Sequence, residues 1–272
     1  MKIIDGERLA RKREVALKIK VDQLRKKGIK LKLVTIVMKD DEAGLLYSRL
    51  KKEAGKRVGI ELEKVLVEDS AREKIEELIR KYNEDEKVGG IMIQRPSMKW
   101  GKNKGMKRQE FEDWWEKIVE KIDVQKDVDG LREQSKFLMA VVKAVMLVKK
   151  ETDKKWGNAA VVGSKGMVGR KLIEYLEKRD VDVKGFDLND DLNKELIKAD
   201  WVISAAGKEN LIKGEMIKKG TGIIDVGWPK GDVDFDSVKE KAGVITPVPG
   251  GIGPLTVISL LENLVKAVYI KD

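Results

Sequence analysis

An aromatic ring and a primary amine stand four residues apart at Tyr47 and Lys51, in a segment whose apolar residues recur with helical spacing. Residues four apart share one face of a helix, so we expect the two side chains to lie side by side. A stacking ring beside an amine suits a flat heteroaromatic substrate. The alternative is that the tyrosine is a surface residue and the lysine is one of many. Considered without other residues, the pair is better explained by this alternative.

Two further polar residues stand where ligands commonly bind. Gln94 ends the apolar run 89–94 (GGIMIQ), and parallel sheets present their ligands at such strand ends. A buried glutamine also needs hydrogen-bond partners. Asp129 lies in the compact turn 126–130 (KDVDG), where a solvated Asx turn is the alternative. Both are candidate site residues.

The chain of 272 residues contains no cysteine and no histidine. Disulfides, thiolate catalysis, Cys/His zinc sites and any Ser-His-Asp or Cys-His mechanism are therefore excluded. Proton transfer must be carried out by Lys, Asp, Glu or Tyr, and we expect no metal.

A glycine-rich turn, 163–169 (GSKGMVG), follows an apolar run and precedes a helical pattern. Glycines at such a turn allow backbone amides to approach a pyrophosphate, and the following helix adds partial positive charge. An ordinary strand-to-helix turn is the alternative, because the spacing differs from G-x-G-x-x-G. The candidate dinucleotide-binding residues here are Gly163, Ser164, Lys165, Gly166 and Gly169.

An acidic residue, Asp187, closes the next predicted strand, 24 residues after Gly163. An acid near this position commonly accepts hydrogen bonds from the adenine ribose, which favours NAD because a carboxylate repels a 2′-phosphate. Lys165 and Arg170 lie nearby in the sequence and favour NADP. The choice between the two dinucleotides therefore stays open, and Asp187 as a plain turn residue is a further alternative.

Three of the chain's five prolines and three of its glycines lie within 246–256 (TPVPGGIGPLT). A rigid loop that exposes so much backbone between a strand and a helix indicates part of a binding site rather than a simple connection. Its candidate residues are Pro247, Pro249, Gly250, Gly251, Gly253, Pro254 and Thr256.

Strand-like and helix-like segments alternate along the chain, which predicts an α/β protein with mostly parallel sheets. Strands are predicted at 31–38, 61–67, 89–94, 159–162, 181–186, 201–204, 222–226 and 244–246. Helices are predicted at 40–58, 70–82 with a capping box of Ser70 and Glu73, 111–121 with Trp114 and Trp115 as packing residues, 135–150, and from Pro254 onward. The polar stretch 149–158 is the predicted junction into a second unit.

The formal net charge is +10, with 57 basic and 47 acidic residues. A nucleic-acid surface is one interpretation, with the basic run 99–108 (KWGKNKGMKR) as an exposed contact loop. Because acidic residues are interspersed almost everywhere, a mixed solvated surface is favoured. No apolar run reaches the ~20 residues that span a bilayer, and no signal peptide is recognisable, so we expect a cytoplasmic protein.

Several segments, in order over residues 35–266, resemble the bifunctional methylenetetrahydrofolate dehydrogenase/methenyltetrahydrofolate cyclohydrolase family. The most specific is TPVPGGIGPLTVISLLEN, which is nearly identical to the C-terminal signature of that family. KDVDGL, GGIMIQRP and YSRLKKEAGKRVGI are similar to its central motif, strand end and Tyr-x-x-x-Lys helix. VVGSKGMVGRKL and IIDVGW are similar to its cofactor-domain segments.

The resemblance implies two α/β domains with a cleft between them: a folate domain (1–145, completed by helix 254–272) and a Rossmann-like dinucleotide domain (146–253). It implies oxidation of 5,10-methylenetetrahydrofolate with NADP, hydrolysis of the methenyl product to 10-formyltetrahydrofolate, and a homodimer. In its roles, Tyr47 stacks on the pterin, Lys51 is the catalytic amine that Gln94 orients, and Asp129 holds the polar edge of the pterin. The loop 247–256 lines the folate cleft, and the turn 163–165 and the backbone at Trp228 contact the dinucleotide.

For Lys51 to act as a base near neutral pH, its pKa must fall from ~10.4. Burial and the cationic substrate would both lower this pKa. We therefore expect Lys51 to be buried in the folate site.

The sequence departs from the family pattern in four places. Gly163-Ser164-Lys165 stands where the family has Gly-Arg-Ser, and Asp187 stands in place of a serine, which weakens the implication of NADP. Residues 95–98 and 139–142 also differ. A homologue with one activity or impaired catalysis is therefore an alternative, as is a nucleic-acid-binding protein on a Rossmann scaffold.

Overall fold

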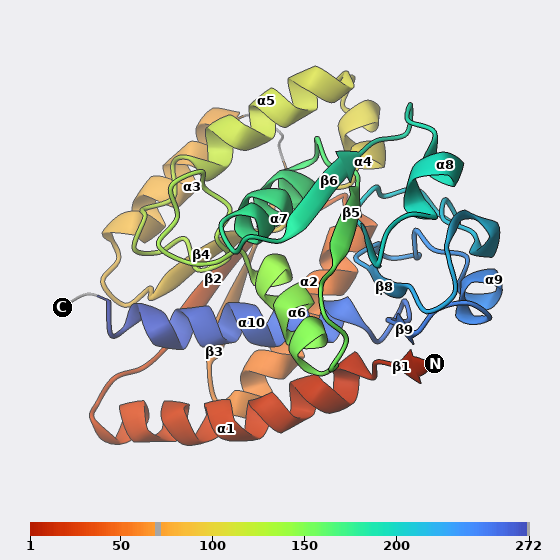
Figure 1. Ribbon diagram of the computed structural model, residues 1–272. Helices are drawn as coiled ribbons and strands as arrows, with labels where there is room; N and C mark the ends of the chain where they lie inside the picture. The colour runs from red at the N-terminus through yellow and green to blue at the C-terminus, as the bar shows by residue number, and fades with distance from the viewer. Residues whose placement is uncertain (69–71, 271–272) are drawn as a thin grey trace. The chain divides into compact units, whose positions relative to one another are not determined.

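The computed structural model describes residues 1–68 and 72–270, which divide into two compact units. Unit 1 comprises Met1–Arg11 and Val141–Thr256, and unit 2 comprises Lys12–Ala140 and Val257–Asp272. Both units combine helices with sheets of parallel strands (Figure 1). The predicted α/β class with parallel sheets is therefore confirmed.

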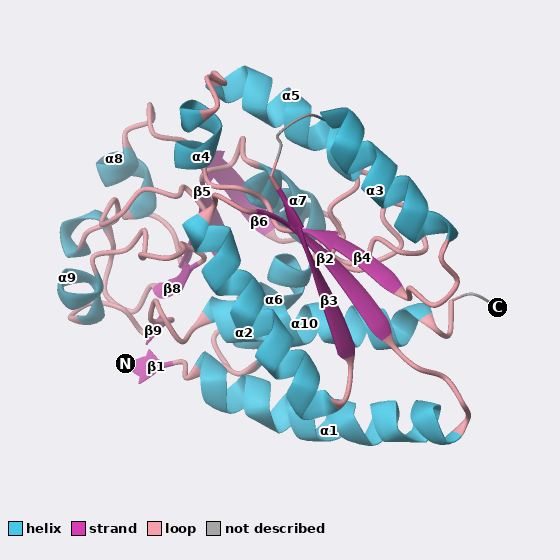
Figure 2. Ribbon diagram, turned by 180° about the vertical axis from the view of Figure 1, so that it is seen from behind, coloured by secondary structure: helices cyan, strands magenta, loops and turns pink. Residues whose placement is uncertain are grey.

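Unit 2 is built on a three-stranded sheet in the order β3-β2-β4. The central strand β2 (Lys32–Met38) has six buried residues and pairs in parallel with β3 (Glu61–Val67) and β4 (Gly90–Ile93). Helix α2 (Glu42–Val58) packs on β2 and β3, as Figure 2 shows. The remaining helices are α3 (Arg72–Glu84), α4 (Met98–Asn103), α5 (Arg108–Val119), most of α1 (Gly6–Lys26) and most of α10 (Ile252–Ala267).

Unit 1 is built on a six-stranded parallel sheet in the order β1-β9-β8-β7-β5-β6. Its core consists of buried aliphatic side chains from these strands, such as Val162, Val202 and Ile223. The strands are β1 (Lys2–Ile3), β5 (Asn158–Val162), β6 (Asp182–Phe186), β7 (Trp201–Ser204), β8 (Gly222–Asp225) and β9 (Val244–Ile245). The helices are α6 (Ala140–Lys150), α7 (Met167–Glu177), α8 (Leu192–Leu196), the 3₁₀ turn η1 (Gly214–Met216) and α9 (Phe235–Lys239).

All eight predicted strands are present with ends shifted by at most one residue, but the helical predictions were less accurate in extent. The segment 135–150 is helical only from Ala140, because Ser135 instead donates its hydroxyl to the Asp127 carbonyl and accepts from the Phe137 amide. The last helix begins at Ile252, two residues before Pro254. A proline in a first helical turn removes an N–H that has no intrahelical partner there.

The first half of the basic run 99–108, predicted to be an exposed loop, lies in α4, and only 104–107 lie outside a helix. Ser97 caps this helix by accepting from the Trp100 amide, and Trp100 is 3% exposed. Its ring lies 5.4 Å from that of Trp114, so the segment is fixed by burial of aromatic side chains. Trp115 is fully buried, in line with its predicted packing role. The predicted cap Ser70 lies outside the described residues.

The compact units differ from the predicted domain ranges mainly at residues 1–11 and 141–145. The chain's first residues belong to unit 1 because β1 pairs in parallel with β9. No pattern in the sequence indicated this two-residue strand. The assignment of one function to each range stays a prediction.

Candidate active site and dinucleotide site

Helix α2 and strand β4 bring three of the predicted folate-site residues together in unit 2. The Lys51 Nζ donates to Gln94 Oε1 at 3.0 Å and lies 4.4 Å from the centroid of the Tyr47 ring. It also donates to the thioether sulfur of Met92 at 2.9 Å. Lys51 is 3% exposed. Its amine contacts one amide oxygen, one sulfur and one aromatic face.

The local sequence explains this close approach. Asp41 caps α2 by accepting from the Gly44 amide, and Gln94 keeps its place beside β2 by donating its backbone N–H to the Ile36 carbonyl. A Cβ atom on Gly44 would lie 3.1 Å from the Gln94 side chain and 2.4 Å from the Asp41 carboxylate. Glycine at this position therefore lets the strand end pack against the helix within reach of Lys51.

Hydrogen bonds also tie the exit of β4 to the start of α2. The Ser97 hydroxyl donates to Asp41 at 3.0 Å, and the indole N–H of Trp100 donates to Asp40 at 2.5 Å. These bonds fix Gln94 relative to the helix that carries Lys51.

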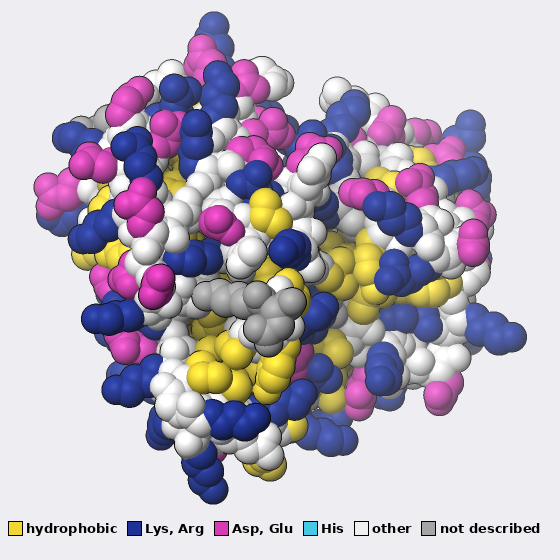
Figure 3. Space-filling model, turned by 90° about the vertical axis from the view of Figure 1, so that its left-hand side faces the viewer, with side chains coloured by type: hydrophobic (Ala, Val, Ile, Leu, Met, Phe, Trp, Pro, Cys, Tyr) yellow, Lys and Arg dark blue, Asp and Glu magenta, His cyan; other side chains and the backbone are white. Residues whose placement is uncertain are grey.

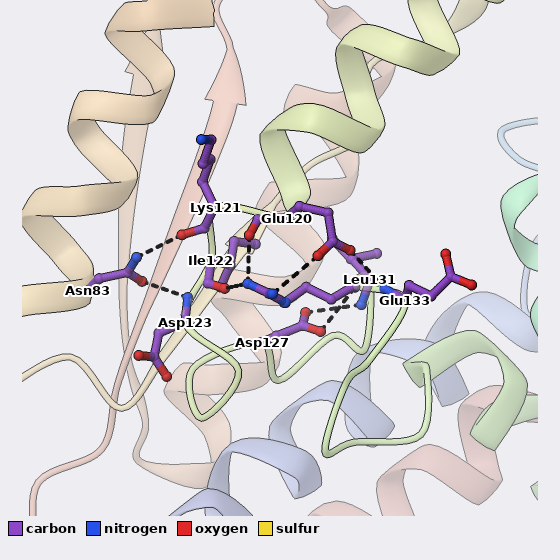
Figure 4. Close-up of polar contacts among 9 residues, drawn as sticks. Asn83, Glu120, Lys121, Ile122, Asp123, Asp127, Leu131 and Glu133 are labelled. Carbon is purple, nitrogen blue, oxygen red and sulfur yellow. Dashed lines mark hydrogen bonds and ion pairs between the residues drawn. The ribbon is translucent and has the colours of Figure 1, made fainter.

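The loop that carries Asp129 is held by a polar network around Asp127 (Figure 4). The buried Asp127 carboxylate accepts from the amides of Leu131 and Arg132, and the Arg132 guanidinium donates to the carbonyls of Glu120 and Ile122. From α10, the Asn263 side chain donates to the carbonyls of Val128 and Leu138 at 2.9 and 3.0 Å.

The charges of Asp129 and Lys51 affect each other's pKa. Burial lowers the pKa of Lys51 from 10.5 to about 8, against an opposing effect of the Asp129 carboxylate. Burial likewise raises the pKa of Asp129, and the Lys51 ammonium opposes that rise. The lowered pKa is the property that the sequence argument required of Lys51.

Lys126, in the same motif, is a structural residue that the sequence reasoning missed. Lys126 is 6% exposed, and its ammonium donates to the carbonyls of Tyr82, Asn83 and Asp85 at 2.9, 2.6 and 2.9 Å. These carbonyls lie at the end of α3, where a cation is favourable. Burial raises the pKa of Asp127 to about 6. Because charged residues usually indicate an exposed turn, neither role could be recognised from composition.

In unit 1 the glycine turn has the geometry of a dinucleotide-binding turn. Gly163 has a φ of +84°, and a Cβ atom on it would lie 2.5 Å from the Ala205 carbonyl. A Cβ atom on Gly169 would lie 2.2 Å from the Gly163 carbonyl, so the helix can pack on the turn only without a side chain there. Gly166 is the N-cap of α7, so the N-terminus of this helix lies at the glycine turn. These features fit a pyrophosphate group.

Asp187 lies directly beside this turn. Its carboxylate accepts from the Ser164 hydroxyl at 2.6 Å and from the Lys165 amide at 3.4 Å. Its own amide donates to Asp190 at 2.6 Å, which places a second carboxylate close by. The structure thus brings Gly163, Ser164, Lys165 and Asp187 together.

The other predicted residues of unit 1 lie in two loops. Trp228 follows β8, and the segment from Pro247 follows β9 and runs into α10. In this second loop Gly250 has a φ of +98°, and a Cβ atom on Gly251 would lie 2.5 Å from the Pro247 carbonyl. The Thr256 hydroxyl donates to the Ile252 carbonyl within α10. Of the remaining predicted residues, Pro249 lies in this loop, whereas Gly253 and Pro254 lie in the first turn of α10.

Neither a metal-binding cluster nor a membrane span occurs in the described part of the chain. Among residues 1–68 and 72–270, no group of three or more acidic side chains could hold a metal ion. Within the same ranges, no helix is long and apolar enough to cross a membrane.

A parallel α/β unit with a glycine turn and a second α/β unit with a buried lysine define a two-domain, dinucleotide-dependent enzyme. Residues 4–129 match the catalytic domain of the tetrahydrofolate dehydrogenase/cyclohydrolase family, and residues 139–272 match its NAD(P)-binding domain. The chain belongs to this family.

Relatives and solved structures agree over nearly the full length. The bifunctional protein FolD of Staphylococcus aureus is 34% identical, over 98% of this chain and 96% of its own. The FolD methylenetetrahydrofolate dehydrogenase/cyclohydrolase of Campylobacter jejuni is 31% identical with a TM-score of 0.87, over all of both chains. The Trypanosoma brucei enzyme, solved with NADP and an inhibitor, is 27% identical with a TM-score of 0.86, over 99% of this chain and 97% of its own.

The chain is accordingly an NAD(P)-dependent enzyme that oxidises 5,10-methylenetetrahydrofolate to the methenyl form and hydrolyses that product to 10-formyltetrahydrofolate.

Proposed function

We propose that unit 2 binds the folate, that unit 1 binds the dinucleotide, and that Lys51 acts as the base in the hydrolysis step. The observation that carries this proposal is the contact of the buried Lys51 amine with Gln94 and Tyr47, with the Asp129 carboxylate acting on the same amine.

For the oxidation, the chain provides alignment of the substrate rather than a nucleophile. The Tyr47 ring stacks on the pterin, and the Asp129 carboxylate accepts hydrogen bonds from its polar edge. When bound, the dinucleotide supplies the hydride acceptor. The turn 163–166 and the N-terminus of α7 would hold its pyrophosphate.

For the hydrolysis, Lys51 in its neutral form takes a proton from the water that attacks the methenyl carbon; the bond from this carbon to N5 then breaks, and N5 keeps the second proton of the added water while the net proton leaves to solvent. With a pKa of about 8, the neutral amine is a minor but substantial fraction near neutral pH. The Gln94 oxygen accepts a hydrogen bond from the amine at 3.0 Å and so directs its lone pair. The Asp129 carboxylate stabilises the ammonium that forms.

A spectrophotometric assay tests this function. Purified protein is given methylenetetrahydrofolate with NAD or NADP, and reduced nicotinamide and methenyl absorbance are followed. We expect reduced dinucleotide to accumulate while the methenyl band decays. Dinucleotide reduction with a stable methenyl band would indicate a dehydrogenase alone, and no reduction with either dinucleotide would refute the function.

We further propose that NAD is preferred over NADP. The Asp187 carboxylate, fixed by Ser164 and flanked by Asp190, supports this because it would repel a 2′-phosphate. The test compares kcat/KM for the two dinucleotides in the wild type and in Asp187→Ser, with Asp182→Ser as an exposed control. We expect the preference for NAD to fall in the first variant alone, and an NADP preference in the wild type would contradict this.

We also propose a homodimer that forms along β3. This strand is an edge of its sheet, and Leu66 on it is 44% exposed. Leu46 and Leu50, four apart on the adjoining α2, are 45% and 46% exposed. Exposed apolar edges favour pairing. Light scattering should report a dimer that Leu66→Lys dissociates and Leu188→Lys, in unit 1, leaves intact; a wild-type monomer would contradict the proposal.

The surface favours the enzyme over the nucleic-acid alternative. Lys and Arg side chains are interspersed with Asp and Glu over the face in Figure 3. Steeply salt-dependent binding of RNA or DNA without saturable dinucleotide binding would instead support the nucleic-acid alternative.

We propose a cytoplasmic enzyme, because folates and nicotinamide dinucleotides are intracellular substrates.

A further inference from the structure

A fully buried carboxylate, Asp232, lies beneath the loop that follows β7 in unit 1. It accepts from the Ser204 hydroxyl at 2.7 Å and from the amides of Ala206, Gly207 and Lys208 at 2.7, 3.2 and 2.9 Å. Four donors converge on this one side chain. The path of the backbone through 205–208 is therefore fixed by Asp232.

A second buried carboxylate, Asp225, fixes the loop that carries Asp232 itself. It accepts from the amides of Gly227, Asp232 and Val233 at 2.8, 3.1 and 2.9 Å. Its own amide donates to the Thr246 hydroxyl at 2.8 Å, which links the loop to the end of β9. The loops after β7 and β8 and the end of β9 are thus joined at the carboxyl edge of the sheet, where sheets of this kind bind dinucleotides.

The first of these loops is in contact with the glycine turn. A Cβ atom on Gly163 would lie 2.5 Å from the Ala205 carbonyl oxygen and 2.9 Å from the Cα of Ala206. The turn therefore packs directly on the segment that Asp232 holds. A shift of 205–208 would displace Gly163 and the amides that follow it.

Burying a carboxylate costs free energy unless hydrogen bonds compensate for the lost solvent, and two such carboxylates lie close together here. Burial raises the pKa of Asp225 to about 6, and the Asp232 carboxylate adds to this rise. Loops that only connect elements can be closed without buried charge. The two carboxylates are compensated mainly by backbone amides of the loops next to the glycine turn, which indicates a role in the conformation of those loops.

We propose that Asp232 is a positioning residue for the dinucleotide: it holds the loop 205–208, and through it the glycine turn, in the conformation that binds the pyrophosphate. This rests on the proposed binding of the dinucleotide by unit 1. Asp225 and Ser204 support the same arrangement, the first by holding Asp232 and the second by donating to it.

The test compares Asp232→Asn, Ser204→Ala and the control Asp234→Asn, which makes the same change two residues away at the N-cap of α9. The Asp232→Asn change would direct an NH₂ group at backbone donors, whereas Ser204→Ala removes one donor and leaves the carboxylate. Calorimetry gives the Kd for NAD and for NADP, and hydrolysis of methenyltetrahydrofolate without dinucleotide reports on unit 2. Thermal melting checks folding.

We expect the Kd for the preferred dinucleotide to rise about 10-fold or more in Asp232→Asn, roughly 3-fold in Ser204→Ala, and not in the control, in keeping with the loss of hydrogen bonds to a charged group. Dinucleotide-free hydrolysis should stay within about 2-fold of wild type. Unchanged Kd values in folded Asp232→Asn and Ser204→Ala would overturn the proposal. The proposal would also be overturned if the folded Ser204→Ala protein lost both hydrolysis rate and melting temperature while its Kd for the dinucleotide stayed unchanged. A wild type that binds dinucleotide but has no folate activity would refute the proposed function and leave this test intact.

Discussion

Replacing Lys51 with methionine removes a buried amine while keeping an unbranched apolar side chain of similar length. In the native protein the pKa of Lys51 is about 8, and in the unfolded chain it returns to its usual 10.5. Between these values the unfolded chain binds more protons than the native protein, so the free energy of unfolding rises with pH. The difference corresponds to up to ~3 kcal/mol, all of it from one side chain.

Urea denaturation followed by tryptophan fluorescence measures this effect. Other groups titrate in the same range, but they contribute equally to the wild type and to Lys51→Met, so the difference between the two proteins isolates Lys51. The free energy of unfolding of Lys51→Met minus that of the wild type should fall by up to ~3 kcal/mol between about pH 7.5 and about pH 10.5. Lys52→Met, the neighbouring exposed lysine, is the matched control and should show no such trend.

A constant difference between wild type and Lys51→Met across this range would refute the reasoning. It would mean that the native amine is as well solvated or as well paired as it is in the unfolded chain. A trend of equal size in Lys52→Met would show that the effect does not depend on burial.

Three further predictions follow from the same geometry. The rate of methenyltetrahydrofolate hydrolysis, corrected for the uncatalysed reaction, should rise with pH through an apparent pKa of about 8, because only neutral Lys51 accepts a proton; a profile that is flat across this value would contradict the role. Gly44→Ala should lower the kcat of hydrolysis by about 10-fold, because its Cβ would displace Gln94 and Asp41, whereas Ala43→Ser, next to it, should not; equal kcat values would show that the contact is not needed. Lys126→Met should lower the free energy of unfolding by roughly 3 kcal/mol, because three carbonyls at the end of α3 lose their donor; a loss no greater than that of exposed Lys121→Met in urea denaturation would contradict this.

The strand positions and the proximity of Tyr47, Lys51 and Gln94 could be predicted because their signals are local. The runs at 31–38 and 201–204 are apolar and short, as expected of buried parallel strands, and the structure has them within one residue. Tyr47 and Lys51 are four apart on a real helix, so their common face followed from helical geometry. Gln94 could be recognised because it directly follows an apolar strand.

Features that depend on tertiary contacts could not be predicted. The helix expected at 135–150 begins at Ala140 because Ser135 bonds to the Asp127 backbone and Asn263, 125 residues from Leu138, donates to that carbonyl. Residues 98–103 form a helix because Trp100 is buried against Trp114, although its neighbours are mostly polar or basic. The buried carboxylates of Asp225 and Asp232 had no local signal, since acidic residues beside glycines usually indicate a turn.

Hydrolysis of methenyltetrahydrofolate by Lys51→Met, measured without dinucleotide and beside the dehydrogenase rate of the same preparation, tests most directly whether a buried amine carries out the second step. We predict that hydrolysis falls by at least ~10²-fold while the variant still binds and reduces the dinucleotide. Hydrolysis at the wild-type rate would show that the protons are handled elsewhere and that the contact of Lys51 with Gln94 has no catalytic role.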